Sequence, residues 1–158
     1  MKTIQLTNSD QVVLVDDDLF DYLNQWRWQL HSQGYVSRST KSNGHITTFL
    51  MHRVIMKLLC TDKIQVDHID HNKLNNQRNN LRYATNQQNH GNTNKNTVRS
   101  SKYKGVHLER KTGKFIAQIR FNYRKQHIGT FITEIEAARA YNQKAIELFG
   151  EYARLNDV

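Results

Sequence analysis

The chain has 158 residues, of which 37% are hydrophobic, and this length fits one ordinary domain or two small ones. Its formal net charge of +9 and its pI of about 9.8 make an anionic polymer the leading class of partner. One cysteine, Cys60, excludes a disulfide framework and a Cys-rich zinc ribbon. We find no signal peptide and no apolar run of about eighteen residues, so we expect a soluble protein that is neither secreted nor membrane-spanning.

The N-terminal third predicts a small mixed α/β core from its alternating and helical patterns. We expect two short strands, a helix with acids in its first turn, a hairpin and a buried helix, at residues 3–6 and 11–15, 16–26, 34–49 and 49–59 respectively. On the last helix, His52 is expected to pack between the helix and the strands that follow, and Arg53 to reach a phosphate.

Residues 66–90 are dominated by Asn, His, Asp and other polar residues, and their apolar side chains are too few to make a core. The polar residues could be turn formers, or they could be ligands arranged around an ion. Residues 66–70 and 79–84 predict two short strands, and Thr85 with Gln88 predicts a capping box at the start of a helix. Two strands and a helix could thus converge on one ion.

This polar run contains the groups that phosphodiester hydrolysis requires, namely a general base for water and ligands for a cation beside the scissile phosphate. His68 offers an imidazole that titrates near neutrality. Asp67 and Asn89 offer side-chain oxygens of the kind that magnesium prefers. Asn80 offers an amide that could fix the loop carrying His68. We interpret three other amides as turn formers, namely Asn75, Asn76 and Asn79.

The second half of the chain carries most of the positive charge, because residues 91–158 hold thirteen Lys and Arg against six Asp and Glu. Residues 91–101 have no apolar period and predict a linker. Three strand-like runs follow, and then a helix that begins at a capping box of Thr133 and Glu136. We expect a three-stranded antiparallel sheet with the helix on its apolar face. The other face, rich in Lys, Arg, Gln and His, is expected to lie open to solvent.

The stretch from Val66 to Asn89 resembles the HNH nucleases, in the branch that reads D-H-x-(D/N), then N-L-(R/E), T and N, as in phage and intron homing endonucleases. The resemblance implies that Asp67 and Asn89 ligate a metal ion and that His68 activates water. It also implies that Asn80 orients the His68 loop. The third letter of the motif is Asn rather than His, which favours Mg²⁺ or Mn²⁺ over zinc.

The chain departs from the HNH pattern at one further position. His71 stands where that family commonly has Gly, and a left-handed backbone at Asn72 would supply the tight turn that Gly allows. An EF-hand-like loop is excluded, because the Gly and the closing Glu of that motif are missing at their fixed offsets.

Residues 103–156 resemble the plant ethylene-response-factor DNA-binding domain, the APETALA-two type, through the pieces YKGV, GKFIAQIR, IGTF, EAARAYNQKAIELFG and ARLN. Such domains lay a three-stranded sheet in the DNA major groove and also occur fused to HNH nucleases. The resemblance implies that Lys104, His107, Gln118, Arg120, Lys125 and His127 face DNA and that Arg110 and Lys114 contact phosphates. In the first half of the chain, Arg53 and Arg82 are further expected DNA contacts. The plant recognition sequence is not transferred, because the plant domains commonly have Arg or Trp at several of these positions.

Together these features predict an α+β, two-part DNA endonuclease, with an HNH nuclease domain over 1–90, its ββα-metal motif over 66–90, a linker over 91–101 and a DNA-binding domain over 102–158. It would nick double-stranded DNA with Mg²⁺ or Mn²⁺, leaving a 3′-hydroxyl and a 5′-phosphate. We expect a monomer, with a dimer as the other option, in the cytoplasm of a bacterial or phage-infected cell. One alternative is a non-catalytic, sequence-specific DNA-binding regulator with a decayed nuclease motif, and another is an RNA-directed enzyme.

Overall fold

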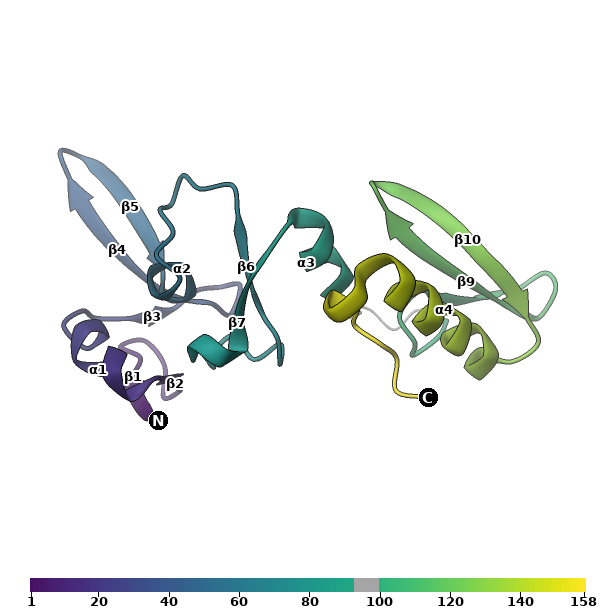
Figure 1. The fold of residues 1–158 in the computed structure, drawn as a ribbon, viewed down its shortest axis with the longest axis horizontal. Helices are drawn as coiled ribbons and strands as arrows, with labels where there is room; N and C mark the ends of the chain where they lie inside the picture. The colour runs from purple at the N-terminus through teal and green to yellow at the C-terminus, as the bar shows by residue number, and fades with distance from the viewer. Residues whose placement is uncertain (93–99) are drawn as a thin grey trace. The chain divides into compact units, whose positions relative to one another are not determined.

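The computed structural model of the protein describes residues 1–92 and 100–158, apart from the side chain of His90 (Figure 1). The described chain forms two compact units, Met1–Ala84 and Thr85–Val158. Small antiparallel sheets and helices make up both units, which confirms the predicted mixture of α and β structure. The domain boundaries predicted at residues 90 and 102 stay a prediction, since residues 93–99 of the predicted linker lie outside the described residues.

The first unit consists of three small antiparallel sheets and short helices. The sheets are β1 (Lys2–Gln5) with β2 (Val12–Val15), β3 (Gln29–Leu30) with β4 (Val36–Ser42) and β5 (His45–Leu50), and β6 (Gln65–His68) with β7 (Leu81–Ala84). The helices are α1 (Asp17–Leu23), α2 (Met51–Ile55) and the 3₁₀ turn η1 (Arg78–Asn80). The turn between β4 and β5 is made by Asn43 and Gly44, both with positive φ, as a tight hairpin requires.

The helix predicted over residues 49–59 is wrong at both ends, because β5 takes the first two of these residues and α2 ends at Ile55. Lys57 has a φ of 56°, which turns the backbone out of the helix. The guanidinium of Arg53 then donates hydrogen bonds to the carbonyl oxygens of Leu59, Asp62 and Ile64. Side-chain hydrogen bonds thus close the loop that the apolar pattern had assigned to the helix.

The core of the first unit contains buried side chains from β1, β2, α1, β4, α2, β6 and β7. Its buried residues include Ile4, Val13, Val15, Leu23, Trp28, Val36, Met51, Val66 and Leu81. The chain leaves α1 earlier than predicted, and the indole nitrogen of Trp28 donates to the carbonyl oxygen of Leu23 over 2.8 Å. Strand β2 also holds the polar loop that follows β6, because Leu14 N donates to Leu74 O over 2.8 Å and Leu14 O accepts from Asn76 N over 2.9 Å.

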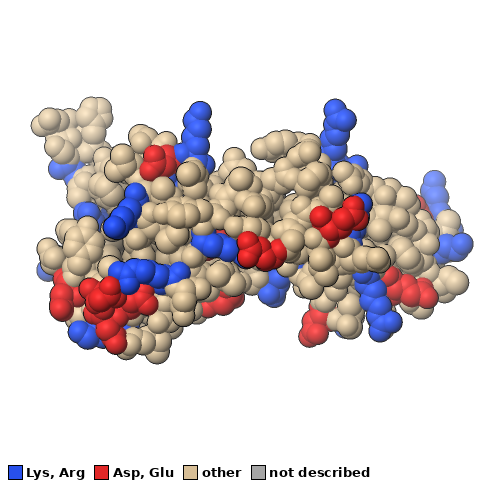
Figure 2. Space-filling view, viewed as in Figure 1, with Lys and Arg blue, Asp and Glu red and all other residues tan. Residues whose placement is uncertain are grey.

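The polar residues 66–90 are also held at the start of α1, where a group of acidic side chains gathers (Figure 2). The guanidinium of Arg78 donates to both carboxylate oxygens of Asp18, over 3.0 and 2.8 Å. The backbone N of Arg78 donates to Asp16 Oδ2 over 2.9 Å. These contacts fix η1, and η1 leads directly into β7.

The second unit consists of helix α3 (Asn86–Asn92) and a sheet with a long helix. The sheet has the order β10–β9–β8, and its elements are β8 (Val106–Glu109), β9 (Lys114–Phe121), β10 (Arg124–Phe131), α4 (Glu134–Phe149) and the 3₁₀ turn η2 (Gly150–Tyr152). The predicted capping box of Thr133 and Glu136 at the start of α4 is confirmed. Across residues 1–92 and 100–158, no helix is long and apolar enough to cross a membrane.

Helix α4 covers one face of this sheet. Two clusters of buried side chains fill the space between them, and they contain Val106, Ala117, Ile119, Ala137, Ala138, Tyr141, Ala145 and Phe149. Phe115 and Phe121 of β9 pack against the same clusters. The alternation along β9 therefore sends Phe115, Ala117, Ile119 and Phe121 toward α4, which leaves the side chains between them on the other face.

Gly105 offers a test of this packing. It has a φ of 75°, and an added Cβ would lie 2.1 Å from the ring of Tyr141 and 2.6 Å from Gln118 O. Because both the backbone strain and the overlap must be relieved, Gly105→Ala should lower the free energy of unfolding of the second unit by about 3 kcal/mol. Gly113→Ala is the matched control, with a φ of 70° and no atom within 4 Å of the added Cβ, and it should cost only about 1 kcal/mol. Urea denaturation measures both, and equal losses would contradict the packing described for Tyr141.

Candidate active site

The polar residues of the predicted motif lie on the strand pair β6–β7 of the first unit. Asp67 and His68 are the last two residues of β6, and Asn80 ends η1 immediately before β7. In the antiparallel register, Asp67 stands opposite Arg82 and His68 stands opposite Leu81. Asp67, His68 and Asn80 are all buried, so each of these polar side chains needs partners to offset its lost hydration.

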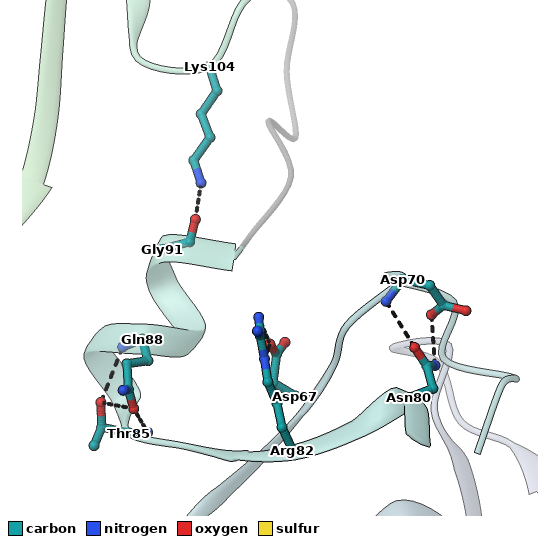
Figure 3. A network of polar contacts seen from close by, with 8 residues as sticks. All are labelled: Asp67, Asp70, Asn80, Arg82, Thr85, Gln88, Gly91 and Lys104. Atoms are coloured by element: carbon teal, nitrogen blue, oxygen red, sulfur yellow. Dashed lines mark hydrogen bonds and ion pairs between the residues drawn. The ribbon is translucent and has the colours of Figure 1, made fainter. Parts of the chain in front are cut away.

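The carboxylate of Asp67 finds its partner directly across the strand pair. Both Nε and Nη2 of Arg82 lie 2.9 Å from Asp67 Oδ2 (Figure 3). Arg82 was predicted to contact DNA, and the structure gives its guanidinium this carboxylate as a partner instead. The DNA contact of Arg82 stays a prediction.

Asn80 closes the loop that follows His68. Its Oδ1 accepts a hydrogen bond from Asp70 N over 3.0 Å, and its Nδ2 donates to Asp70 Oδ1 over 2.8 Å (Figure 3). Its Nδ2 also donates to Asn75 O over 2.8 Å. Its backbone O also accepts from Ile69 N over 2.9 Å. These contacts are the kind that the predicted role of orienting the His68 loop requires.

The tight turn of this loop is made by a different residue from the one expected. His71 has a φ of 64°, and Asn72 is not among the described residues with positive φ, so the expectation of a left-handed backbone at Asn72 is wrong. Asn72 instead holds the turn through hydrogen bonds, because its N donates to Asp70 Oδ1 over 2.7 Å and its Oδ1 accepts from Leu74 N over 3.1 Å. A left-handed residue at position 71 explains why Gly suits that position in the HNH pattern.

The imidazole of His68 is held by an amide that the sequence did not single out. Asn76 is fully buried, its Nδ2 donates to Lys73 O over 3.0 Å, and its Oδ1 lies 3.4 Å from His68 Nε2. Asn76 was interpreted as a turn former, since nothing in a run of Asn residues distinguishes the one that faces a histidine. Burial lowers the pKa of His68, while the hydrogen bond to Asn76 and the charges of Asp70 and Asp67 act in the opposite direction. The balance leaves a neutral ring at neutral pH, which is the state that accepts a proton.

His52 packs against His68 from α2. The two ring centroids lie 5.2 Å apart, and the centroid of Tyr35 lies 5.1 Å from that of His52. His52 was expected to pack between this helix and the strands that follow, and its contact with His68 of β6 agrees with that. Among the described residues, no hydrogen-bond partner for His52 Nδ1 is present.

The burial of His52 should make the stability of the first unit sensitive to acid. Burial, and then the charges of His68 and Arg53, lower the pKa of His52 from 6.5 to about 3. Because the unfolded chain takes up the proton at higher pH than the folded chain does, stability present above pH 6.5 is lost as the pH falls toward 3. Between pH 7 and pH 5 this loss should be about 2 kcal/mol. Urea denaturation at both pH values should find a smaller loss in His52→Gln than in wild type and in a control with the exposed His45 changed, His45→Gln. The lowered pKa of His68 contributes a loss that all three proteins share. Equal losses in all three would contradict the effect of His52.

The predicted helix after β7 is α3, and it belongs to the second unit. Its predicted capping box is confirmed, because Gln88 N donates to Thr85 Oγ1 over 3.2 Å and Thr85 N donates to Gln88 Oε1 over 2.8 Å (Figure 3). Asn89 is half-buried on α3, and its N donates to Thr85 O over 3.0 Å. The role of Asn89 as a metal ligand stays a prediction.

The last turn of α3 is docked within the second unit. Gly91 O accepts from Lys104 Nζ over 2.6 Å (Figure 3). It also accepts from Arg154 N over 3.1 Å. A Cβ at Gly91 would lie 2.6 Å from the ring of Phe149, so only Gly allows this approach. Burial, and then the charge of Arg154, lower the pKa of Lys104 to about 8. Lys104, a predicted DNA contact, thus has an intramolecular partner.

The remaining predicted DNA contacts of the second unit share the sheet face that α4 leaves open, apart from one in a turn. The register pairs His127 with Gln118, Lys125 with Arg120, and Glu109 with Lys114. The two residues of each pair share a face, and it is the open one because the β9 members alternate with the residues that face α4. His107 pairs with Ile116 on that face too. Arg110 follows β8 in the turn toward β9 and is exposed.

One known protein resembles this chain over most of its length, and a family model matches a shorter part of it. A family model described as HNH endonuclease matches residues 49–91. A protein of Acanthamoeba polyphaga mimivirus named as an uncharacterized HNH endonuclease is 38% identical over 141 residues, which cover 89% of this chain and 72% of that protein. The chain belongs to the HNH endonuclease family. No solved structure matches it.

The HNH match from residue 49 to 91 includes every residue that the motif had singled out. It contains Asp67, His68, Asn80 and Asn89, and it also contains Arg82 and Asn76, whose contacts the sequence did not reveal. The HNH assignment therefore supports a nuclease acting on DNA. Within the described residues, no group of three or more His, Cys, Asp and Glu could hold a metal ion.

Proposed function

We propose that this HNH protein is a metal-dependent endonuclease that nicks double-stranded DNA, with His68 as the general base. The observation that carries the proposal is the buried pair Asp67–His68 at the end of β6, with the following loop closed by Asn80. A base held in this way loses little orientation freedom when substrate arrives, which favours proton transfer in one direction.

The contacts of Asn76 indicate which nitrogen of His68 acts. Because Nδ2 of Asn76 donates to Lys73 O, its Oδ1 is the atom that faces His68 Nε2. Nε2 therefore carries the ring proton, and Nδ1 of the neutral ring is left with the lone pair. In the proposed reaction Nδ1 takes the proton from the attacking water, and cleavage leaves a 3′-hydroxyl and a 5′-phosphate.

The donor set suits a hard divalent cation rather than zinc. Asp67 is a buried carboxylate, and the motif adds the amide oxygen of Asn89, with no cluster of three His, Cys, Asp or Glu among the described residues. Mg²⁺ and Mn²⁺ accept oxygen ligands and Mg²⁺ keeps several waters, so two protein oxygens suffice. When bound, such an ion would supply positive charge beside the scissile phosphate. Asp67 and Asn89 would hold it.

The second unit is proposed to bind the duplex through the open face of its sheet. In support, the cations Lys114, Arg120 and Lys125 are exposed, and Gln118 and His127 lie beside them in register. Cations bound to phosphates give affinity, and Arg and Gln can read base edges. This role as an ethylene-response-factor-like, major-groove binder extends the resemblance of residues 103–156. Tethering would raise the local concentration of DNA at the nuclease unit.

The proposal also includes the oligomeric state, the biological role and the location of the protein. One copy carries one set of catalytic residues, so a monomer would nick, and a double-strand break would need a dimer or two visits. A homing-type role follows from the motif branch. The relative from a virus fits a protein of viral origin or of an infected cell, where it would act in the cytoplasm.

Cleavage of supercoiled plasmid tests the proposed function. Wild-type protein with Mg²⁺ or Mn²⁺ should convert supercoiled plasmid to open circles, and EDTA should stop the conversion. A protein that shifts duplex DNA in a gel but leaves every duplex uncut with either ion would instead be a DNA-binding regulator.

A further inference from the structure

The ion pair between Asp67 and Arg82 occupies the carboxylate that the proposed function assigns to the metal. Two nitrogens of Arg82 contact the same oxygen, Asp67 Oδ2, at 2.9 Å. The side chains are only 7% (Asp67) and 15% (Arg82) exposed. The two residues stand directly opposite each other across β6 and β7, so the strand register itself brings them together. This pair is therefore a built feature of the site rather than a chance contact between mobile surface side chains.

We infer that Arg82 is a positioning residue that neutralises and orients Asp67 in the metal-free protein and competes with the divalent ion for that carboxylate. The inference rests on the proposed metal-dependent function. A buried carboxylate without a partner is strongly unfavourable, and Arg82 supplies the partner when no ion is present. The guanidinium is a planar, rigid cation, so it repels a second cation placed beside Asp67.

The same geometry sets the sign of the effect on metal binding. A divalent ion at Asp67 must share the carboxylate with the guanidinium, and two like charges at short range in a poorly hydrated site repel. Arg82 therefore weakens metal binding by the free protein. A DNA phosphate adds negative charge beside both cations, so DNA and metal should each strengthen the binding of the other.

Removing the contact between Arg82 and Asp67 should make the protein bind metal more tightly. A purely structural role for Arg82 predicts that its loss damages the site and weakens metal binding. Competition predicts the opposite. Arg82→Met should bind Mn²⁺ at least about fivefold more tightly than wild type in the absence of DNA. It should also melt at a lower temperature than wild type without metal, and Mn²⁺ should raise its melting temperature by more.

The test uses the full chain, with Mn²⁺ affinity measured by titration calorimetry and melting followed with and without Mn²⁺. Arg82→Lys, which keeps the charge, should bind Mn²⁺ with nearly wild-type affinity. Arg82→Gln removes the charge and keeps a hydrogen-bond donor for Asp67, so it should bind Mn²⁺ more tightly than wild type. It replaces Arg82→Met in the test if that variant does not fold. Arg27→Met is the matched control, since it removes an exposed arginine of the same unit, between α1 and β3, and its Mn²⁺ affinity should equal that of wild type.

The outcomes separate this inference from the proposed function. Asp67→Asn should abolish Mn²⁺ binding in both the wild-type and the Arg82→Met backgrounds. If Asp67→Asn does so while the neutral Arg82 variants bind no more tightly than wild type, the metal site stands and the competition is refuted. If no variant binds Mn²⁺ and plasmid is cut equally well in EDTA, the metal-dependent function itself fails.

Discussion

Changing His68 to Ala should lower the rate of plasmid nicking by about a hundredfold to ten-thousandfold, because the variant lacks the proposed general base for the attacking water. The side chain of His68 is buried and contacts Asn76 and His52. The neighbouring imidazole of His52 cannot replace it as the base, because the His52 ring is itself packed in the interior. The measurement is the initial rate of open-circle formation in Mg²⁺, together with DNA affinity from a gel shift. DNA affinity should stay within about twofold of wild type, since His68 is not needed for the proposed contacts of the sheet.

The matched control for His68 is His45→Ala, which removes an exposed imidazole from the first residue of β5. It should nick at the wild-type rate. A His68→Ala protein that melts like wild type and keeps more than about a tenth of its activity would rule out general-base catalysis by His68.

Removing two cations from the open sheet face should reduce DNA affinity without affecting stability. Arg120 and Lys125 are neighbours across β9 and β10 and both are exposed. The double variant Arg120→Ala/Lys125→Ala should bind duplex DNA about tenfold to a hundredfold more weakly, and its salt dependence should fall by about one to two released ions. Fluorescence anisotropy at several salt concentrations measures both quantities.

The control for this pair is Arg139→Ala, which removes an exposed cation from α4 on the opposite side of the sheet. It should leave DNA affinity nearly unchanged at a given salt concentration. Equal losses in the two proteins would mean that net charge, rather than the open face of the sheet, controls binding.

Local patterns predicted the second unit better than the first. The three strands and the helix of the second unit lie where alternation, turn residues and the Thr133–Glu136 capping box indicated, since each of these signals acts within a few residues. In the first unit, the helix over 49–59 was overestimated because its end depends on Arg53. The carbonyl oxygens that hold this side chain are up to eleven residues away, and hydropathy does not record such contacts.

The candidate site was predicted residue by residue where the motif has fixed spacing, and not elsewhere. Asp67, His68 and Asn80 are recognisable because their order along the chain is specific. The contacts of Arg82, Asn76 and His52 depend on strand register and on packing between elements far apart in sequence. An Asn among many Asn residues gives no sign that it is fully buried beside a histidine.

The docking of α3 has a consequence for anyone who would build chimaeras from this protein. The HNH family match ends at residue 91, whereas the first compact unit ends at Ala84. Helix α3 lies within the family match, but its last turn is held by Lys104, Arg154 and Phe149 of the second unit. A chimaera that keeps this protein only up to residue 91 would therefore remove the residues that α3 contacts. Exchanging the second unit for another domain thus also requires a new surface to receive Gly91.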